Sequence, residues 1–120
     1  IEGLVDDSGS LYDVSEQQAP AKILSDSAAG ILKEYMINTV ESGTGTAAKP
    51  ESGGAGGKTA TAETGWIKDG REVYQTWFTG FFPADDPQYA VVVLAEDGAS
   101  GSRTSAPVFK LIADYVISRG

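Results

Sequence analysis

The sequence predicts an α+β fold in which a three-stranded antiparallel sheet packs against two helices. Two stretches with helical spacing of apolar residues flank three stretches rich in β-branched and aromatic residues. The connections between the β-rich stretches are short, and strands joined in this way pair as an antiparallel meander. A chain of 120 residues suffices for one core and is too short for two ordinary domains.

The first helix is expected over about residues 25–42. Ser25 or Asp26 would cap its N-terminus, and Gly43 would end it. Between these bounds the apolar residues recur at helical spacing: Ala28, Ile31, Leu32, Tyr35, Met36 and Val40. The residues before it, 1–21, mix Gly, Asp, Ser and Gln around two short apolar groups, and they predict an extended lead-in or a short hairpin.

A glycine-rich loop and three strands are expected next. Residues 43–57 contain six glycines and one proline, a composition typical of a mobile or tightly turned backbone. The strands are expected over roughly 56–63, 73–82 and 88–96, separated by the turn-rich sequences TGWIKDGRE and PADDPQ. Because the third strand is apolar on both faces, we expect it to be a central strand that is covered on two sides.

The last helix is expected near 106–118, opened by Ser105 with Pro107 in its first turn. Its apolar stripe, which should form the core together with the third strand, consists of Val108, Phe109, Ile112, Ala113 and Val116. The aromatic residues of the second strand alternate inward, which favours core packing over a carbohydrate-stacking surface: Trp77, Phe78, Phe81 and Phe82. Trp66, beside Gly65 in an expected loop, is the better candidate for an exposed aromatic residue near a groove.

The composition argues against several classes of function. The formal net charge of −8 disfavours nucleic acid as a partner, because phosphates require clustered Lys and Arg. The chain has no Cys and no His, which excludes disulfides, cysteine nucleophiles, a Ser-His-Asp triad and most transition-metal sites. We therefore expect no metal and no cofactor.

Two acidic pairs are interpreted in structural terms. Asp85 and Asp86 lie in PADDP, where turn formation explains both residues. Glu63 and Glu96 are explained better as solvated strand ends than as a glycosidase pair.

The longest apolar run, YAVVVLA, is far shorter than the ~20 residues that a membrane helix needs. The chain opens with Ile1, which suggests a segment of a longer protein.

The stretch GGKTATAE, residues 56–63, allows three interpretations. A phosphate-binding P-loop would need Gly at position 52, which is Ser, and a helix after the lysine. An edge strand would place Thr59 and Thr61 on one face and Lys58 and Ala60 on the other, so that it could bind an extended peptide and its carboxylate. The third interpretation is an exposed edge strand whose lysine only prevents aggregation.

The chain resembles the C-terminal part of the transpeptidase domain of penicillin-binding proteins, above all of the high-molecular-weight class B type. The resemblance is carried by SDSAAGILKEYMINTVESGTGTAA, GGKTATAE, WFTGFFPADDPQYAVVVLAEDG and APVFKLIADYV. It covers about residues 22–118 in order and spacing, and residues 1–21 fit the connecting segment before it. It implies that the three strands and two helices are part of a larger penicillin-binding fold.

The resemblance implies roles for four residues. Lys58, Thr59 and Ala60 stand where the family has Lys-Thr-Gly or Lys-Ser-Gly. Lys58 would support the electrostatics and the proton relay, Thr59 would bind the carboxylate of the substrate or antibiotic, and the backbone N–H of Thr61 would belong to the oxyanion hole. Ala60 departs from the family glycine, and its methyl group should lie on the face away from Thr59.

The chain lacks the two other motifs of the family. No Ser is followed three residues later by Lys, and the only Asn, Asn38, is not part of Ser-x-Asn. The resemblance therefore implies a fragment of a peptidoglycan D,D-transpeptidase that is inactive alone, since covalent catalysis needs a nucleophile and a base within reach. The implied partners of the intact domain are the D-Ala-D-Ala stem peptide and β-lactams.

Several expectations follow from this resemblance. The parent would lie on the extracytoplasmic face of the bacterial membrane, with its anchor outside this chain. An uncovered apolar strand edge would make the fragment dimeric or prone to strand exchange. A serine β-lactamase, a penicillin-sensing receptor and a non-catalytic peptide-binding or scaffolding module remain as alternatives.

Overall fold

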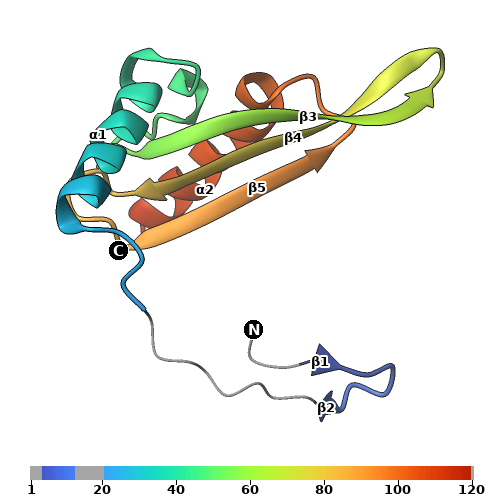
Figure 1. Cartoon of the computed structure of the whole chain (residues 1–120), viewed down its shortest axis with the longest axis horizontal. Coiled ribbons are helices and arrows are strands. Elements are labelled where there is room, and N and C mark those ends of the chain that lie inside the picture. The colour runs from blue at the N-terminus through green and yellow to red at the C-terminus, as the bar shows by residue number, and fades with distance from the viewer. Residues whose placement is uncertain (1–3, 13–20, 120) are drawn as a thin grey trace.

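The computed structural model describes residues 4–12 and 21–119 of the chain and has the expected α+β architecture (Figure 1). Its strands and helices are β1 (Leu4–Val5), β2 (Leu11–Tyr12), α1 (Asp26–Ser42), β3 (Gly56–Lys68), β4 (Arg71–Phe82), β5 (Tyr89–Glu96) and α2 (Ala106–Ile117). A short 3₁₀ helix (Thr46–Ala48) interrupts the glycine-rich segment, and a π-helical turn (Gly101–Ser105) leads directly into α2.

The sheet has the strand order β3-β4-β5, and both pairings are antiparallel. The expectation that residues 88–96 form the central strand is wrong for this sheet, because β4 occupies the centre and β5 has no partner on its outer side among residues 4–12 and 21–119. One face of β5 contributes buried Val93, whereas Val92 and Leu94 on the other face are 62% and 44% exposed. The apolar composition of β5 thus exceeds what this sheet buries.

The hairpin between β3 and β4 is longer than expected. Most of TGWIKDGRE is strand, and the turn is confined to Asp69 and Gly70, whose φ values of 52° and 77° are both positive. Two central residues with positive φ characterise the tight turn that matches the twist of hairpin strands, and Asp-Gly is a favoured sequence for it. A change of register between Glu63 and Ile67 accommodates the extra residues of β3.

The core lies between the sheet and α2, which crosses one face of the strands (Figure 1). The fully buried Phe109 of α2 packs against Phe78 and Phe82 of β4, with ring centroids 4.7 Å and 5.7 Å apart. Trp77 and Phe81 lie on the opposite face of β4 and are half-buried. The predicted inward alternation of the β4 aromatic residues is therefore confirmed.

Helix α1 is capped as expected, but it buries fewer of its apolar side chains than the stripe in its sequence predicts. The Ser25 hydroxyl accepts a hydrogen bond from the Ala28 N–H at 3.2 Å, and Gly43 is the C-terminal cap. Only Val40 of the stripe is fully buried, where the end of α1 meets the core. Ile31 and Tyr35 are more than half exposed, so the first half of the stripe has no cover in the described part of the chain.

The start of α2 differs from the prediction. Ser105 has helical dihedral angles and makes no capping bond with its side chain, because the helical path already begins at Gly101. The Ser100 hydroxyl caps this path by accepting from the Arg103 N–H at 3.2 Å. Buried Ser105 instead donates its hydroxyl to the carbonyl oxygen of Thr76 at 2.8 Å and thereby ties α2 to β4.

The N-terminal segment contains a short hairpin, formed by β1 and β2, which is one of the two forms expected for it. An Asp6 carboxylate oxygen accepts from the N–H groups of Ser8 and Ser10 and so organises the turn. The rest of the expected lead-in, residues 1–3 and 13–20, lies outside the described residues. Of the helices that the structure describes, none is both long and apolar enough to cross a membrane.

Candidate functional site

The four residues singled out in the sequence lie in the first half of β3. This strand has β4 on one side, and no strand among residues 4–12 and 21–119 lies on its other side. Lys58 and Ala60 stand opposite Thr79 and Trp77 of β4. Thr59 and Thr61 stand opposite Phe78 and Thr76, on the face that α2 covers. The methyl group of Ala60 therefore lies on the face away from Thr59, as predicted.

The direction of the backbone groups follows from their partners along β4. The carbonyl oxygen of Val73 accepts a hydroxyl from β3, whereas that of Tyr74 accepts the N–H of Gly98 just beyond β5. Since successive residues of a strand direct these groups to opposite sides, odd-numbered β4 residues bond to β3. The antiparallel register then directs the N–H groups of Thr59 and Thr61 away from β4, toward the open edge.

The hydroxyl of Thr59 is held by the turn that follows α1. Its Oγ1 lies 2.9 Å from the Oγ1 of Thr44, which is the central residue of the Gly-Thr-Gly sequence. The turn itself is fixed because the N–H groups of Gly43 and Gly45 both donate to the carbonyl oxygen of Thr39, at 3.1 Å and 3.0 Å. Two hydroxyls of different elements thus meet at the edge of β3.

Lys58 is the one cationic side chain in the first half of β3, and it is exposed. Its Nζ donates to the carbonyl oxygen of Thr59 at 2.6 Å, so the ammonium group lies beside the same open edge. An ammonium group, two hydroxyls and outward N–H groups are all donors to oxygen. This edge is therefore suited to bind a carboxylate and a polarised carbonyl.

Gly101, which the sequence analysis did not single out, supports the same strand from the α2 face. Its N–H donates to the Oγ1 of Thr61 at 3.2 Å. A Cβ at this position would lie 2.6 Å from the carbonyl oxygen of Ala60 and 2.7 Å from that of Trp77. Only glycine fits so close to two strands, but a lone glycine after a serine gives no signal of this contact in the sequence.

The two acidic pairs do not form a site. Glu63 pairs with Tyr74 and Glu96 with Gln75, so the two glutamates lie on opposite faces of the sheet. Asp85 and Asp86 lie in the bend between β4 and β5. Among the described residues no group of three or more acidic side chains is placed to hold a metal ion.

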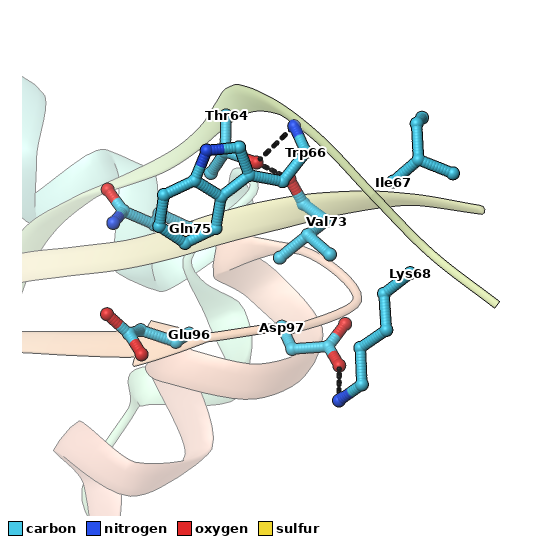
Figure 2. A pocket seen from close by; sticks show the side chains of 8 residues that line it. All are labelled: Thr64, Trp66, Ile67, Lys68, Val73, Gln75, Glu96 and Asp97. Carbon is cyan, nitrogen blue, oxygen red and sulfur yellow. Dashed lines mark hydrogen bonds and ion pairs between the residues drawn. The ribbon is translucent and has the colours of Figure 1, made fainter. Parts of the chain in front are cut away.

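A hollow of about 410 Å³ lies at the far end of the β3–β4 hairpin, between the hairpin and the end of β5 (Figure 2). It is lined by Thr64, Trp66, Ile67, Lys68, Val73, Gln75, Glu96 and Asp97. Trp66 belongs to β3 and is not in a loop, but it is 68% exposed, as expected of an exposed aromatic residue.

Asp97, at one side of this hollow, is the centre of a network of ion pairs. Arg71 donates to both of its carboxylate oxygens, at 2.6 Å and 2.9 Å, and Lys68 donates at 3.1 Å. These hydrogen bonds, first from Arg71 and then from Lys68, lower the pKa of Asp97 to about 2. The carboxylate is thus ionised at neutral pH and is paired with two cations.

Comparison with known proteins gives a consistent picture. Residues 1–114 match the family model described as "Penicillin binding protein transpeptidase domain". The chain is 33% identical over 94 residues to the peptidoglycan D,D-transpeptidase MrdA of Acinetobacter baumannii, an alignment that covers 70% of this chain and 14% of that protein. The chain thus spans a small part of the curated relatives that it matches.

Solved structures agree with the sequence match. The transpeptidase domain of the FtsI4 D,D-transpeptidase from Legionella pneumophila superposes with a TM-score of 0.65 at 30% identity, covering 78% of this chain and 37% of that one. A peptidoglycan synthetase from Bifidobacterium adolescentis gives a TM-score of 0.76 over 98% of this chain and 22% of that one, and at 20% identity it supports the fold alone. The chain belongs to the penicillin-binding protein transpeptidase family, and its curated relatives are class B members.

Proposed function

We propose that this chain is the C-terminal segment of a serine D,D-transpeptidase that cross-links peptidoglycan, and that β3 forms one wall of its acylation site. The observation that carries the proposal is the position of Lys58–Thr61 on the open edge of β3, in a chain whose residues 1–114 match the transpeptidase family. The substrate would be a stem peptide that ends in D-Ala-D-Ala.

Each residue of this edge has a role in the proposal. The terminal carboxylate of the stem peptide accepts hydrogen bonds from the Thr59 hydroxyl and is attracted by the Lys58 ammonium group. The carbonyl group that reacts points its oxygen at the N–H of Thr61, which stabilises the negative charge that develops there. Ala60 lies between these two contacts and turns its methyl group to the opposite face of the sheet.

The reaction needs groups from outside this chain. A serine oxygen attacks the carbonyl carbon of the penultimate D-Ala, a base takes the serine proton, and the terminal D-Ala leaves as its amine is protonated. An amine of a second stem peptide then attacks the acyl-enzyme, forms the cross-link and releases the serine. A β-lactam would acylate the same serine by opening its ring.

Because no Ser-x-x-Lys or Ser-x-Asn occurs in the sequence, we expect the 120-residue chain alone to be inactive. The parent protein would act on the extracytoplasmic face of the bacterial membrane, where peptidoglycan lies, and its anchor would be elsewhere in the parent. A non-catalytic peptide-binding module, a serine β-lactamase and a penicillin-sensing receptor are the competing assignments.

Acylation by a fluorescent penicillin tests the proposal, with this chain and the full-length parent labelled in parallel. We expect a stable covalent label on the parent and none on the chain alone. In the parent, Lys58→Met should slow labelling by about 10²-fold or more, the size typical of a lost acid–base or electrostatic group. Lys22→Met, which removes an exposed lysine paired with Asp26, is the matched control.

The competing assignments predict different results. A folded parent that takes no label would favour the binding module over the transpeptidase. A label that forms and is then rapidly hydrolysed would favour a β-lactamase. A long-lived label without cross-linking of peptidoglycan strands would favour a penicillin-sensing receptor.

A further inference from the structure

We propose that the hollow at the end of the β3–β4 hairpin is a saccharide subsite that binds the glycan to which the stem peptide is attached. This inference rests on the proposed function, because it assumes that the stem peptide lies along β3. It adds a second binding region, beyond the acylation site, and a second chemical class of ligand, a neutral sugar.

The aromatic wall of the hollow has the chemistry that a sugar ring requires. Trp66 extends its indole from β3 over the hollow toward Gln75, with Glu96 across from it (Figure 2). The indole is 68% exposed although it lies against a concave surface. A pyranose ring carries C–H groups on its faces and hydroxyls at its rim, and a flat aromatic face packs well against such C–H groups.

The polar side chains of the hollow match the rim of a sugar. Gln75 and Glu96 are register partners on β4 and β5, and within the described residues neither side chain bonds a neighbour. A carboxylate accepts hydrogen bonds from hydroxyl and amide N–H groups, and a carboxamide both donates and accepts. Sugar hydroxyls and an N-acetyl group would satisfy both residues.

The charge of the hollow favours a neutral ligand over an anionic one. Asp97 is paired with two cations, Arg71 and Lys68, at 2.6–3.1 Å. Glu96 has no direct counterion among the described residues, but the second of these cations offsets its charge, so the four side chains carry no net charge. An anionic ligand would find both cations already engaged by Asp97 and would meet the carboxylate of Glu96, whereas a neutral saccharide needs no counterion.

The direction of the stem peptide leads its glycan to the hollow. A carboxylate at Thr59 and a reacting carbonyl at Thr61 make the bound peptide run toward Trp66 as it is followed back to its N-terminal end. The stem peptide is joined to its sugar at that end. Thr61 and Ile67 stand opposite Thr76 and Glu72 of β4, so the path from Thr61 to the residue after Trp66 covers about 13 Å, the span of about four extended residues.

The face of the sheet is also consistent with this path. Alternate residues of a strand share a face, so Lys58, Ala60 and Ala62 point to the same side of the sheet. Gln75 of β4 stands opposite Ala62 and therefore lies on that face as well. The hollow is lined by Gln75 and Val73 from that face of β4. The hollow and Lys58 therefore share the face that lies away from α2, whereas the hydroxyls of Thr59 and Thr61 lie on the α2 face. A peptide bound along the edge of β3, in the plane of the sheet, borders both faces and can reach the hollow without crossing the sheet.

The binding experiment uses the full-length parent and a soluble oligosaccharide of N-acetylglucosamine, with the dissociation constant measured by titration calorimetry. We expect binding by the wild type, a dissociation constant about two- to tenfold higher for Trp66→Ala, and an intermediate value for Trp66→Phe. Tyr35→Ala is the matched control, because Tyr35 is an equally exposed aromatic residue on α1 (66%) and should not change binding.

Three outcomes would overturn the subsite. The wild-type parent could fail to bind the oligosaccharide, or the Trp66→Ala variant could bind it as tightly as the wild type. In the third outcome, acrylamide does not quench the fluorescence of Trp66 in the free parent. The last outcome would mean that another part of the parent or a bound protein fills the hollow.

Penicillin labelling of the same parent preparation separates the two proposals. A labelled parent that fails to bind the saccharide contradicts the subsite and leaves the transpeptidase assignment intact. An unlabelled parent that binds through Trp66 contradicts the transpeptidase assignment, and with it the stem-peptide path on which this inference rests.

Discussion

At the scale of single residues, the position of the candidate site depends on how closely Gly101 approaches β3. Its N–H donates to the side chain of Thr61, and a Cβ at its position would lie 2.6–2.7 Å from the carbonyl oxygens of Ala60 and Trp77. The same glycine is the first residue of the π-helical turn that starts α2. A side chain here would separate the helical layer from the strand that carries the proposed oxyanion donor.

We predict that Gly101→Ala lowers the free energy of unfolding of the intact transpeptidase domain by about 1–3 kcal/mol, the usual cost of overpacking. The new methyl group would have to displace backbone atoms, which lie 2.6–2.9 Å away and cannot rotate aside. Because the displaced strand includes Ala60, penicillin labelling of the parent should also be slower. Denaturant unfolding and the labelling rate measure the two effects.

The control for this prediction is Gly30→Ala on α1, where a Cβ would meet nothing within 4 Å. Alanine is favoured over glycine in a helix interior by about 1 kcal/mol, so this variant should be more stable than the wild type. Equal stability of Gly101→Ala and the wild type would show that the contact between Gly101 and β3 is loose.

At the scale of elements, ion pairs connect the far end of the long β3–β4 hairpin to the residue that follows β5. Arg71 and Lys68 flank the Asp69-Gly70 turn and both bond Asp97, which follows β5. The hairpin tip is thereby tied to the end of the third strand. This network also forms one side of the hollow in which Trp66 lies.

We predict that this network stabilises the protein at neutral pH and is lost in acid. The pKa of Asp97 is lowered from an ordinary value of 3.8 to about 2, so the folded state favours the ionised carboxylate. Its stabilisation is complete above pH 4 and disappears as the pH falls toward 2. Thermal unfolding as a function of pH should therefore show Asp97→Asn to be less stable than the wild type at pH 7, with the difference vanishing near pH 2.

Glu34→Gln serves as the control, because Glu34 is an exposed carboxylate on α1 without a bond to another described residue. It should follow the wild type across the pH range. A difference between Asp97→Asn and the wild type that persists unchanged at pH 2 would mean that the variant acts through packing and not through charge.

The elements differ in how far the sequence could predict them. Ser25 and Gly43 mark the ends of α1 through local backbone chemistry, so both bounds of this helix were predictable. The turn within TGWIKDGRE was predicted but could not be narrowed to Asp69 and Gly70, because Thr64 and Gly65 also favour turns. The register change there keeps Gly65 within a strand. The role of Ser105 was missed because its partner, Thr76, is 29 residues away.

The candidate site was predictable only in its local part. The residue types and alternation of Lys58–Thr61 follow from eight consecutive letters of sequence, and the register agrees with that alternation. The hydroxyl contact of Thr59 with Thr44 and the support from Gly101 arise from packing between distant segments. No periodicity in the sequence encodes such contacts, so they required the structure.

At the scale of the whole molecule, the chain has more apolar surface than its own elements cover. β5 is an edge strand in this sheet, and Val92 and Leu94 are exposed on the face opposite α2. Ile31 and Tyr35 on α1 are exposed as well. The apolar composition of β5 predicted a central strand that is covered on both faces. β5 would be such a strand if further strands continued the sheet beyond it.

We predict that the isolated 120-residue chain self-associates through β5. Its unpaired N–H and C=O groups can pair with a second copy, and a two-fold axis would bring the two β5 strands together in antiparallel fashion. The net charge of −8 on each copy opposes this contact, so association should strengthen as salt screens the repulsion. Sedimentation equilibrium should give twice the mass of one chain at high ionic strength.

Val92→Lys tests whether β5 is the contact, because a lysine on an edge strand disfavours pairing with another sheet and adds a charge where two copies would meet. We expect this variant to be monomeric where the wild type is dimeric, whereas Leu111→Lys, at a 69% exposed position of α2, should still dimerise. Dimerisation of both variants would place the contact elsewhere, on the exposed half of α1. A wild type that stays monomeric at every ionic strength would contradict the prediction, because salt would already have screened the repulsion between the two copies.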